Sequence, residues 1–152
     1  GLLVMWGICP RAAWSKEPYR SEVFFHHGTE LFLGDPEEKS LKLAVEEINA
    51  QGGIDGHPVE AVIYDTEGDP GKTVLAVNKL ISKDNVLAVI GPSLTATTLA
   101  VVPIAEKEKV PLISCAAGIK ITDPVRRWVF KTAQNDVLAV AAIYDHMKKK
   151  GI

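Results

Sequence analysis

A cluster of hydroxyl side chains follows one apolar strand of the predicted sheet. Residues 86–90 are continuous and apolar, which is typical of a strand covered on both faces. Gly91 and Pro92 then lead into residues 93–98, Ser-Leu-Thr-Ala-Thr-Thr, where a helix is expected to begin. Backbone N–H groups at a helix start point outward and favour an anion. The same hydroxyls could instead cap the helix without any ligand, and the spacing leaves both alternatives open.

A second loop of small residues follows a neighbouring predicted strand. Residues 114–118, Ser-Cys-Ala-Ala-Gly, come at the end of a strand expected over 110–115. Ligands bind outside the carboxyl ends of parallel strands, so this loop should face residues 93–98 across one crevice. Small side chains let a ligand approach the backbone closely, although a tight turn would need them too. Together the two loops suit the carboxylate and ammonium groups of an amino acid.

The sequence does not favour an enzyme. A nucleophilic Ser93 or Cys115 would need a histidine base, and His57 falls in a predicted turn. No Gly-x-Ser-x-Gly elbow is present, and no glycine pattern for nucleotide phosphates follows any strand. We therefore expect a binding protein rather than an enzyme.

The two cysteines, Cys9 and Cys115, match no metal-ligand spacing and form no Cys-x-x-Cys motif, so no metal site is predicted. Cys115 is expected to be a small buried residue, with a thiol that lines the site as the alternative.

Charge and hydropathy exclude other classes of function. The 17 Lys and Arg residues against 19 Asp and Glu give a net charge of -2, without the basic footprint of a nucleic-acid-binding protein. No apolar run of about 18 residues predicts a membrane span. Residues 2–8 resemble the tail of a secretory signal, so residues 1–16 are interpreted as an export-signal remnant, with a buried strand as the alternative.

Hydrophobic periodicity predicts alternating strands and helices. Strands are expected at residues 59–65, 86–90, 110–115 and 128–132, and helices around 41–48, 74–81, 95–107 (or from 93) and 136–149. This alternation is typical of an α/β fold with a parallel sheet and right-handed crossovers. Pro103 should kink the third helix. The last helix has an apolar stripe but no following strand to cover, so the chain looks truncated.

Three segments carry a resemblance to a known family. Residues 41–69, 88–103 and 110–132 resemble type 1 periplasmic binding proteins, and among them the branched-chain amino acid binding proteins of ABC importers. The resemblance covers residues 32–152. It implies two α/β lobes joined by a hinge, with ligand between them and no cofactor. The expected fold is therefore a three-layer parallel sheet, the Rossmann-like lobe of such a protein, and incomplete.

The resemblance also implies a division of the chain and a site. Residues 17–134 would form the N-terminal ligand-binding lobe, and 135–152 would begin a second lobe. Since binding depends on closure of two lobes, one lobe should have little or no affinity for the ligand. Thr95 aligns with the family's principal carboxylate-binding hydroxyl, whereas Gly118 lacks a hydroxyl that relatives carry, which puts a simple Leu/Ile/Val specificity in doubt. The ligand-binding residues implied are Ser93, Leu94, Thr95 and Ala96 in one loop, Ala116, Ala117 and Gly118 opposite, and Leu33 in the loop after the first strand.

Residues 19–30 depart most from the family pattern, in which the first strand reads Ile-Lys-Ile-Gly-x-Val-Phe. A local frameshift would explain this departure, and we then expect the central first strand to be damaged.

The sequence thus predicts an exported, periplasmic solute-binding component that delivers an amino acid to the membrane permease of an ABC importer. Two alternatives remain: the ligand-sensing domain of a receptor or regulator, and a Rossmann-like enzyme.

Overall fold

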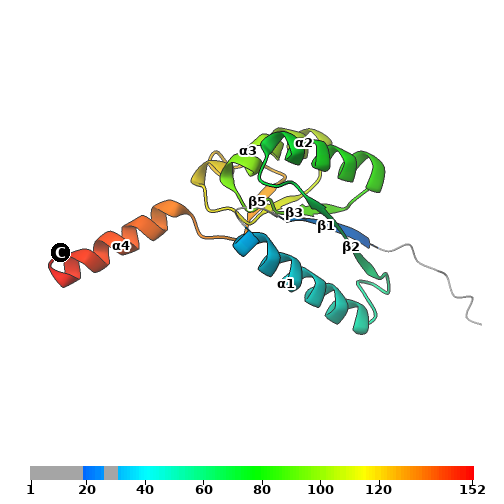
Figure 1. The fold of residues 1–152 in the computed structure, drawn as a ribbon, viewed down its shortest axis with the longest axis horizontal. Helices are drawn as coiled ribbons and strands as arrows, with labels where there is room; N and C mark the ends of the chain where they lie inside the picture. The colour runs from blue at the N-terminus through cyan, green and yellow to red at the C-terminus, as the bar shows by residue number, and fades with distance from the viewer. Residues whose placement is uncertain (1–18, 26–30) are drawn as a thin grey trace, which may run out of the picture.

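The computed structural model describes residues 19–25 and 31–152, which form a parallel five-stranded sheet in the order β2-β1-β3-β4-β5 (Figure 1). Every adjacent pair of strands is parallel. The strands are β1 (Tyr19–Phe25), β2 (Val59–Asp65), β3 (Ala88–Ile90), β4 (Leu112–Ser114) and β5 (Val129–Lys131).

Helices cover both faces of the sheet. In Figure 1, α1 (Leu31–Ala50) lies below the sheet, and α2 (Pro70–Lys79) and α3 (Thr95–Glu108) lie above it. A π-helical turn, Leu80–Asp84, extends α2. The predicted three-layer α/β fold is confirmed.

The first strand forms despite its unusual sequence. All seven residues of β1 are in register with β2, from Tyr19 opposite Val59 to Phe25 opposite Asp65. Ser21, Glu22 and Val23 are also in register with β3. The backbone pairing therefore shows none of the expected damage to the central strand.

The core lies between the sheet and the α2–α3 layer. Asp69 caps α2, with its carboxylate 2.7 Å from the backbone N–H of Lys72, and Pro70 takes the first helical position, where its missing N–H costs nothing. The buried side chains of α3 recur at helical spacing and face the sheet. The buried cluster comprises Val77, Leu80, Val86, Val89, Val101, Val102, Ala105, Leu112, Ala116, Ile121 and Val129.

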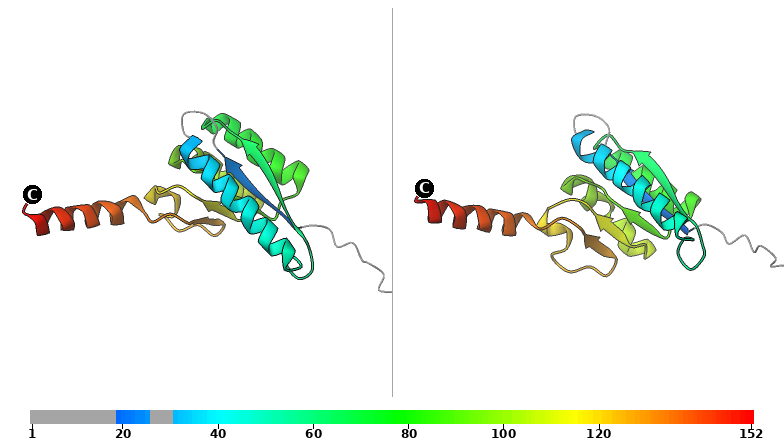
Figure 2. Two further views of the ribbon diagram at one scale, coloured as in Figure 1. Left: turned by 60° about the horizontal axis from the view of Figure 1, so that its bottom comes forward. Right: turned by 90° about the horizontal axis from the view of Figure 1, so that it is seen from below.

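The last helix, α4 (Asp136–Lys150), extends away from the rest of the molecule (Figures 1 and 2). The Asn135 side chain caps it by accepting a 2.9 Å hydrogen bond from the N–H of Leu138. None of its residues is buried, and Leu138 and Tyr144 are 60% and 67% exposed. The division of the chain at residue 135 remains a prediction.

The predicted start of the first helix is wrong. The amphipathic helix expected around residues 41–48 begins at Leu31 and continues through Pro36, so Leu33 lies in α1 and not in a loop.

Within the described parts of the chain, no helix has the length and apolar character needed to cross a bilayer.

Candidate ligand-binding site

The loops after β3 and β4 lie side by side at the carboxyl edge of the sheet. The N–H of Gly91 donates to the carbonyl of Ile113 at 2.8 Å, and the N–H of Cys115 donates to the carbonyl of Pro92 at 3.1 Å. These bonds continue the pairing of β3 and β4 past the strand ends. The loop after β3 (the first loop) and the loop after β4 (the second loop) therefore form one continuous wall.

Thr95 and Gly118 bring the two loops into direct contact. A Cβ atom built on Gly118 would lie 2.4 Å from Cγ2 and 2.7 Å from Oγ1 of Thr95. Two residues that are 23 positions apart in the sequence thus meet at van der Waals distance.

The hydroxyl groups of the first loop do not cap α3. Leu94 is the N-cap residue, and no side chain makes a capping hydrogen bond. The Thr97 hydroxyl donates instead to the carbonyl of Leu94 at 3.0 Å, and the Ser93 hydroxyl donates to the carboxylate of Glu37. The capping alternative is therefore wrong, and the first-turn amides of α3 are left without a side-chain partner.

Thr98 and Ser114 form a buried hydroxyl pair behind the site. Both residues are fully buried, and their Oγ atoms lie 2.8 Å apart. Each hydroxyl is also 3.3 Å from the carbonyl oxygen of Pro92, and the N–H of Ala116 donates to Ser114 Oγ at 3.1 Å. Buried polar groups need such partners, so these two hydroxyls join the loops to each other.

Thr95 differs from the other hydroxyl residues of this wall. Among the residues that the structure describes, nothing forms a hydrogen bond with its side chain, which is half-buried at the first position of α3. An available hydroxyl beside uncapped amides is an arrangement that can accept an anion.

A cavity of about 380 Å3 opens next to this wall, between the N-terminal half of α1 and the ends of β3 and β4. Its lining is mainly apolar and comprises Pro36, Glu37, Ser40, Leu41, Ile90 and Cys115. Cys115 thus lines a cavity, as the alternative interpretation of this residue held. The volume and lining suit a small apolar group.

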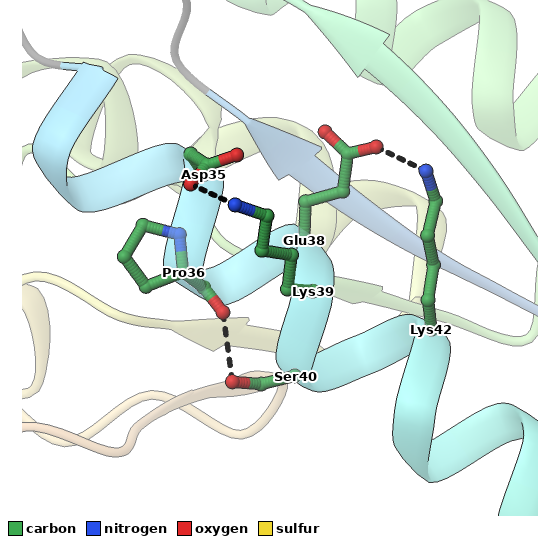
Figure 3. Close-up of polar contacts among 6 residues, drawn as sticks. All are labelled: Asp35, Pro36, Glu38, Lys39, Ser40 and Lys42. Carbon is green, nitrogen blue, oxygen red and sulfur yellow. Dashed lines mark hydrogen bonds and ion pairs between the residues drawn. The ribbon is translucent and has the colours of Figure 1, made fainter.

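Local contacts run along α1 near this side of the cavity (Figure 3). Lys39 pairs with Asp35 at 2.7 Å, Lys42 pairs with Glu38, and the Ser40 hydroxyl donates to the carbonyl of Pro36 at 2.7 Å. The ion pairs are exposed and contribute little stability each, on the order of 0.5 kcal/mol. The charges of these four side chains are nevertheless paired with each other along the helix.

Glu37 is a site residue that sequence reasoning missed. Its carboxylate accepts the hydrogen bond from Ser93, which is 56 positions away in the sequence, and it lines the cavity beside Cys115. Burial raises the pKa of the Cys115 thiol, and the negative charge of Glu37 raises it further. Hydrogen bonds from Thr132 and the backbone of Gly91 lower that pKa, but less.

The raised pKa predicts a protonated, slowly alkylated thiol. Because the folded pKa lies above the unfolded value, the thiol stabilises the fold below the unfolded pKa, and this stabilisation is lost as the pH rises through the folded pKa. In a Cys9→Ser variant, the midpoint of the pH profile for iodoacetamide alkylation should be higher in the folded protein than in urea. Glu37→Gln should lower the folded midpoint, and equal midpoints in both states would contradict the assignment.

The described residues contain no group of three or more His, Cys, Asp or Glu side chains that could hold a metal ion.

The family model that describes periplasmic binding proteins matches residues 28–152. The chain belongs to the periplasmic binding protein family.

Individual relatives agree with this assignment. The chain is 34% identical over 100 residues to a leucine-, isoleucine-, valine-, threonine- and alanine-binding protein of Pseudomonas aeruginosa, covering 65% of this chain and 26% of the relative. It is 37% identical over 84 residues to the Leu/Ile/Val-binding protein of Escherichia coli K12, covering 55% of this chain and 23% of the relative. The chain thus spans about a quarter of the length of the curated relatives it matches.

Solved structures show the same fold. The isoleucine complex of a branched-chain amino acid transporter substrate binding protein from Streptococcus pneumoniae matches with a TM-score of 0.74 and 34% identity, over 80% of this chain and 35% of that one. A leucine binding protein from Thermotoga maritima matches with a TM-score of 0.77 and 27% identity, over 86% of this chain and 37% of that one.

The other implied site residues of this periplasmic binding protein have different surroundings. Ala96 and Ala117 are exposed, and the carbonyl of Ala117 accepts a 2.7 Å hydrogen bond from Lys131 Nζ. Ala116 is only 2% exposed, and its N–H is already bonded to Ser114. Leu94 is half-buried. The roles of all these residues in ligand binding remain predictions.

Proposed function

We propose that this chain is the ligand-binding lobe of an exported amino acid binding protein, which delivers its ligand to the membrane permease of an ABC importer in the periplasm. The observation that carries the proposal is the available hydroxyl of Thr95 beside the uncapped start of α3. This pair of features suits a carboxylate, because hydrogen bonds to a charged group are stronger than neutral ones.

The neighbouring cavity supports an apolar side chain on the ligand. Pro36, Leu41 and Ile90 line it, and α1 and β3 supply them from opposite sides. A carboxylate at Thr95 and an aliphatic side chain in the cavity fit leucine, isoleucine or valine, which the similar proteins from Pseudomonas aeruginosa and Escherichia coli are named for binding.

The proposal includes no chemical step. The Ser93 hydroxyl donates to a carboxylate and not to a histidine base, so it is not activated as a nucleophile. Cys115 has a raised pKa, whereas a catalytic cysteine needs a lowered one.

An NMR titration with leucine tests this function and is sensitive to the weak affinity expected of one lobe. Leucine at millimolar concentration should shift the amide signals of Thr95, Ala96 and Thr97. Thr95→Val, which removes the hydroxyl but keeps the shape, should weaken binding about 10-fold, the effect of losing one hydrogen bond to a charged group.

Two controls sharpen the titration. The amides at the start of α2 should not shift, because Asp69 already caps that helix. Leucinamide, which has no carboxylate, should leave the α3 amides unchanged. Equal shifts with leucine and leucinamide, or shifts unrelated to α3, would refute the proposal.

A further inference from the structure

Gly118 is a glycine that its backbone does not require. Its φ and ψ angles are -57° and 128°, which any residue can adopt. It is buried and directly precedes the 3-10 turn η2 (Ile119–Ile121). The reason for a glycine here must therefore be the space around it.

The side chain of Thr95 occupies that space. The three heavy atoms nearest to a Cβ on Gly118 are Cγ2, Oγ1 and Cβ of Thr95, at 2.4, 2.7 and 3.1 Å. Contacts below 3.0 Å force one side to move, and both close contacts come from the same rotatable side chain. A side chain at position 118 would drive Thr95 into another staggered rotamer, in which its hydroxyl points elsewhere.

Neighbouring contacts limit other ways to relieve this contact. The loop that carries Gly118 is tied to the first loop by the bond from Cys115 to Pro92 and by the buried Ser114–Thr98 pair. On the C-terminal side, the N–H of Ile121 donates to the carbonyl of Gly118 at 3.3 Å, and Ile121 is fully buried. Rotation of Thr95 therefore requires less rearrangement than withdrawal of the loop.

We propose that Gly118 is a specificity-determining positioning residue, whose missing side chain lets Thr95 lean onto the second loop and hold its hydroxyl toward the ligand carboxylate. This inference rests on the proposed function. Position 118 then acts on the ligand through Thr95, and the carboxylate is recognised by one side-chain hydroxyl together with backbone amides.

The test is a cycle of Gly118→Ala, Thr95→Ala and the double variant. Thr95→Ala removes both Cγ2 and Oγ1, the two atoms that lie within 3.0 Å of the added Cβ. Gly118→Ala alone should lower Tm by about 3–6 °C, since roughly 1 kcal/mol shifts Tm by that amount in a domain of this size. It should also weaken leucine binding about 10-fold, while leucinamide binding is unchanged. In the Thr95→Ala background, Gly118→Ala should change Tm and leucine affinity much less.

The preference for leucine over leucinamide separates positioning from simple destabilisation, because a merely structural role would not alter it. An equal fall in Tm in both backgrounds, or an unchanged preference in Gly118→Ala, would overturn the inference. If the unsubstituted chain shows no amide shift with leucine, the proposed function fails, and this role of Gly118 fails with it. The Tm cycle still reports in that case whether the two residues are coupled.

Discussion

Ile121→Ala is expected to lower the free energy of unfolding by about 3–4 kcal/mol, which is typical of removing a fully buried aliphatic side chain. Ile121 is 0% exposed and belongs to the same buried cluster as Leu112 and Val129. It follows Gly118 by three residues, so burial of its side chain also holds the second loop of the site in place. Urea unfolding followed by circular dichroism measures the change as a lower midpoint at an unchanged slope.

Val125→Ala is the matched control for this substitution. Val125 lies in the same connection between β4 and β5 but is 93% exposed. Truncating it should change the free energy of unfolding by no more than about 0.5 kcal/mol. Similar losses in both variants would show that the connection is not anchored by Ile121.

Ser114→Ala is expected to cost about 2 kcal/mol, because it leaves buried polar groups without partners. The N–H of Ala116 would lose its acceptor, and Thr98 would lose the hydroxyl 2.8 Å from its own. The carbonyl of Pro92 would keep the N–H of Cys115 and the Thr98 hydroxyl as partners. The same urea unfolding experiment gives the loss.

Ser40→Ala provides the comparison for Ser114→Ala. Its hydroxyl also donates to a backbone carbonyl, that of Pro36, but the residue is exposed, so water can replace the bond. Its removal should cost less than about 0.5 kcal/mol. An effect of Ser114→Ala no larger than this would mean that the hydroxyl pair does not join the loops.

Local sequence patterns were sufficient for most of the fold. The strand expected at residues 59–65 is β2, and the helix expected from residue 136 is α4. β3 and β4 are shorter than the apolar runs that predicted them, because strand length also depends on where the neighbouring strands pair. The start of α1 was missed because Gly34 and Pro36 are typical of a turn, whereas here the helix continues through both.

The site was harder to predict from the sequence than the fold. The order of strands and hydroxyls correctly placed the two loops next to each other, since parallel strands end at the same edge. The family resemblance singled out Thr95. The residue pattern alone did not separate its available hydroxyl from those of Ser93 and Thr98, because that difference depends on partners distant in the chain. Glu37 went unrecognised for the same reason, since nothing in a charged helix indicates a bond to Ser93.

The position of β1 between β2 and β3 has a consequence for assembly. β2 and β3 follow each other in the chain but do not pair with each other, and only β1 connects them. Without residues 19–25, β2 would have no hydrogen-bonded neighbour, and β3 would expose an unpaired edge, which is a known route to aggregation. Residues 19–25, which lie in the segment that departs most from the family pattern, therefore determine whether the other four described strands become one sheet.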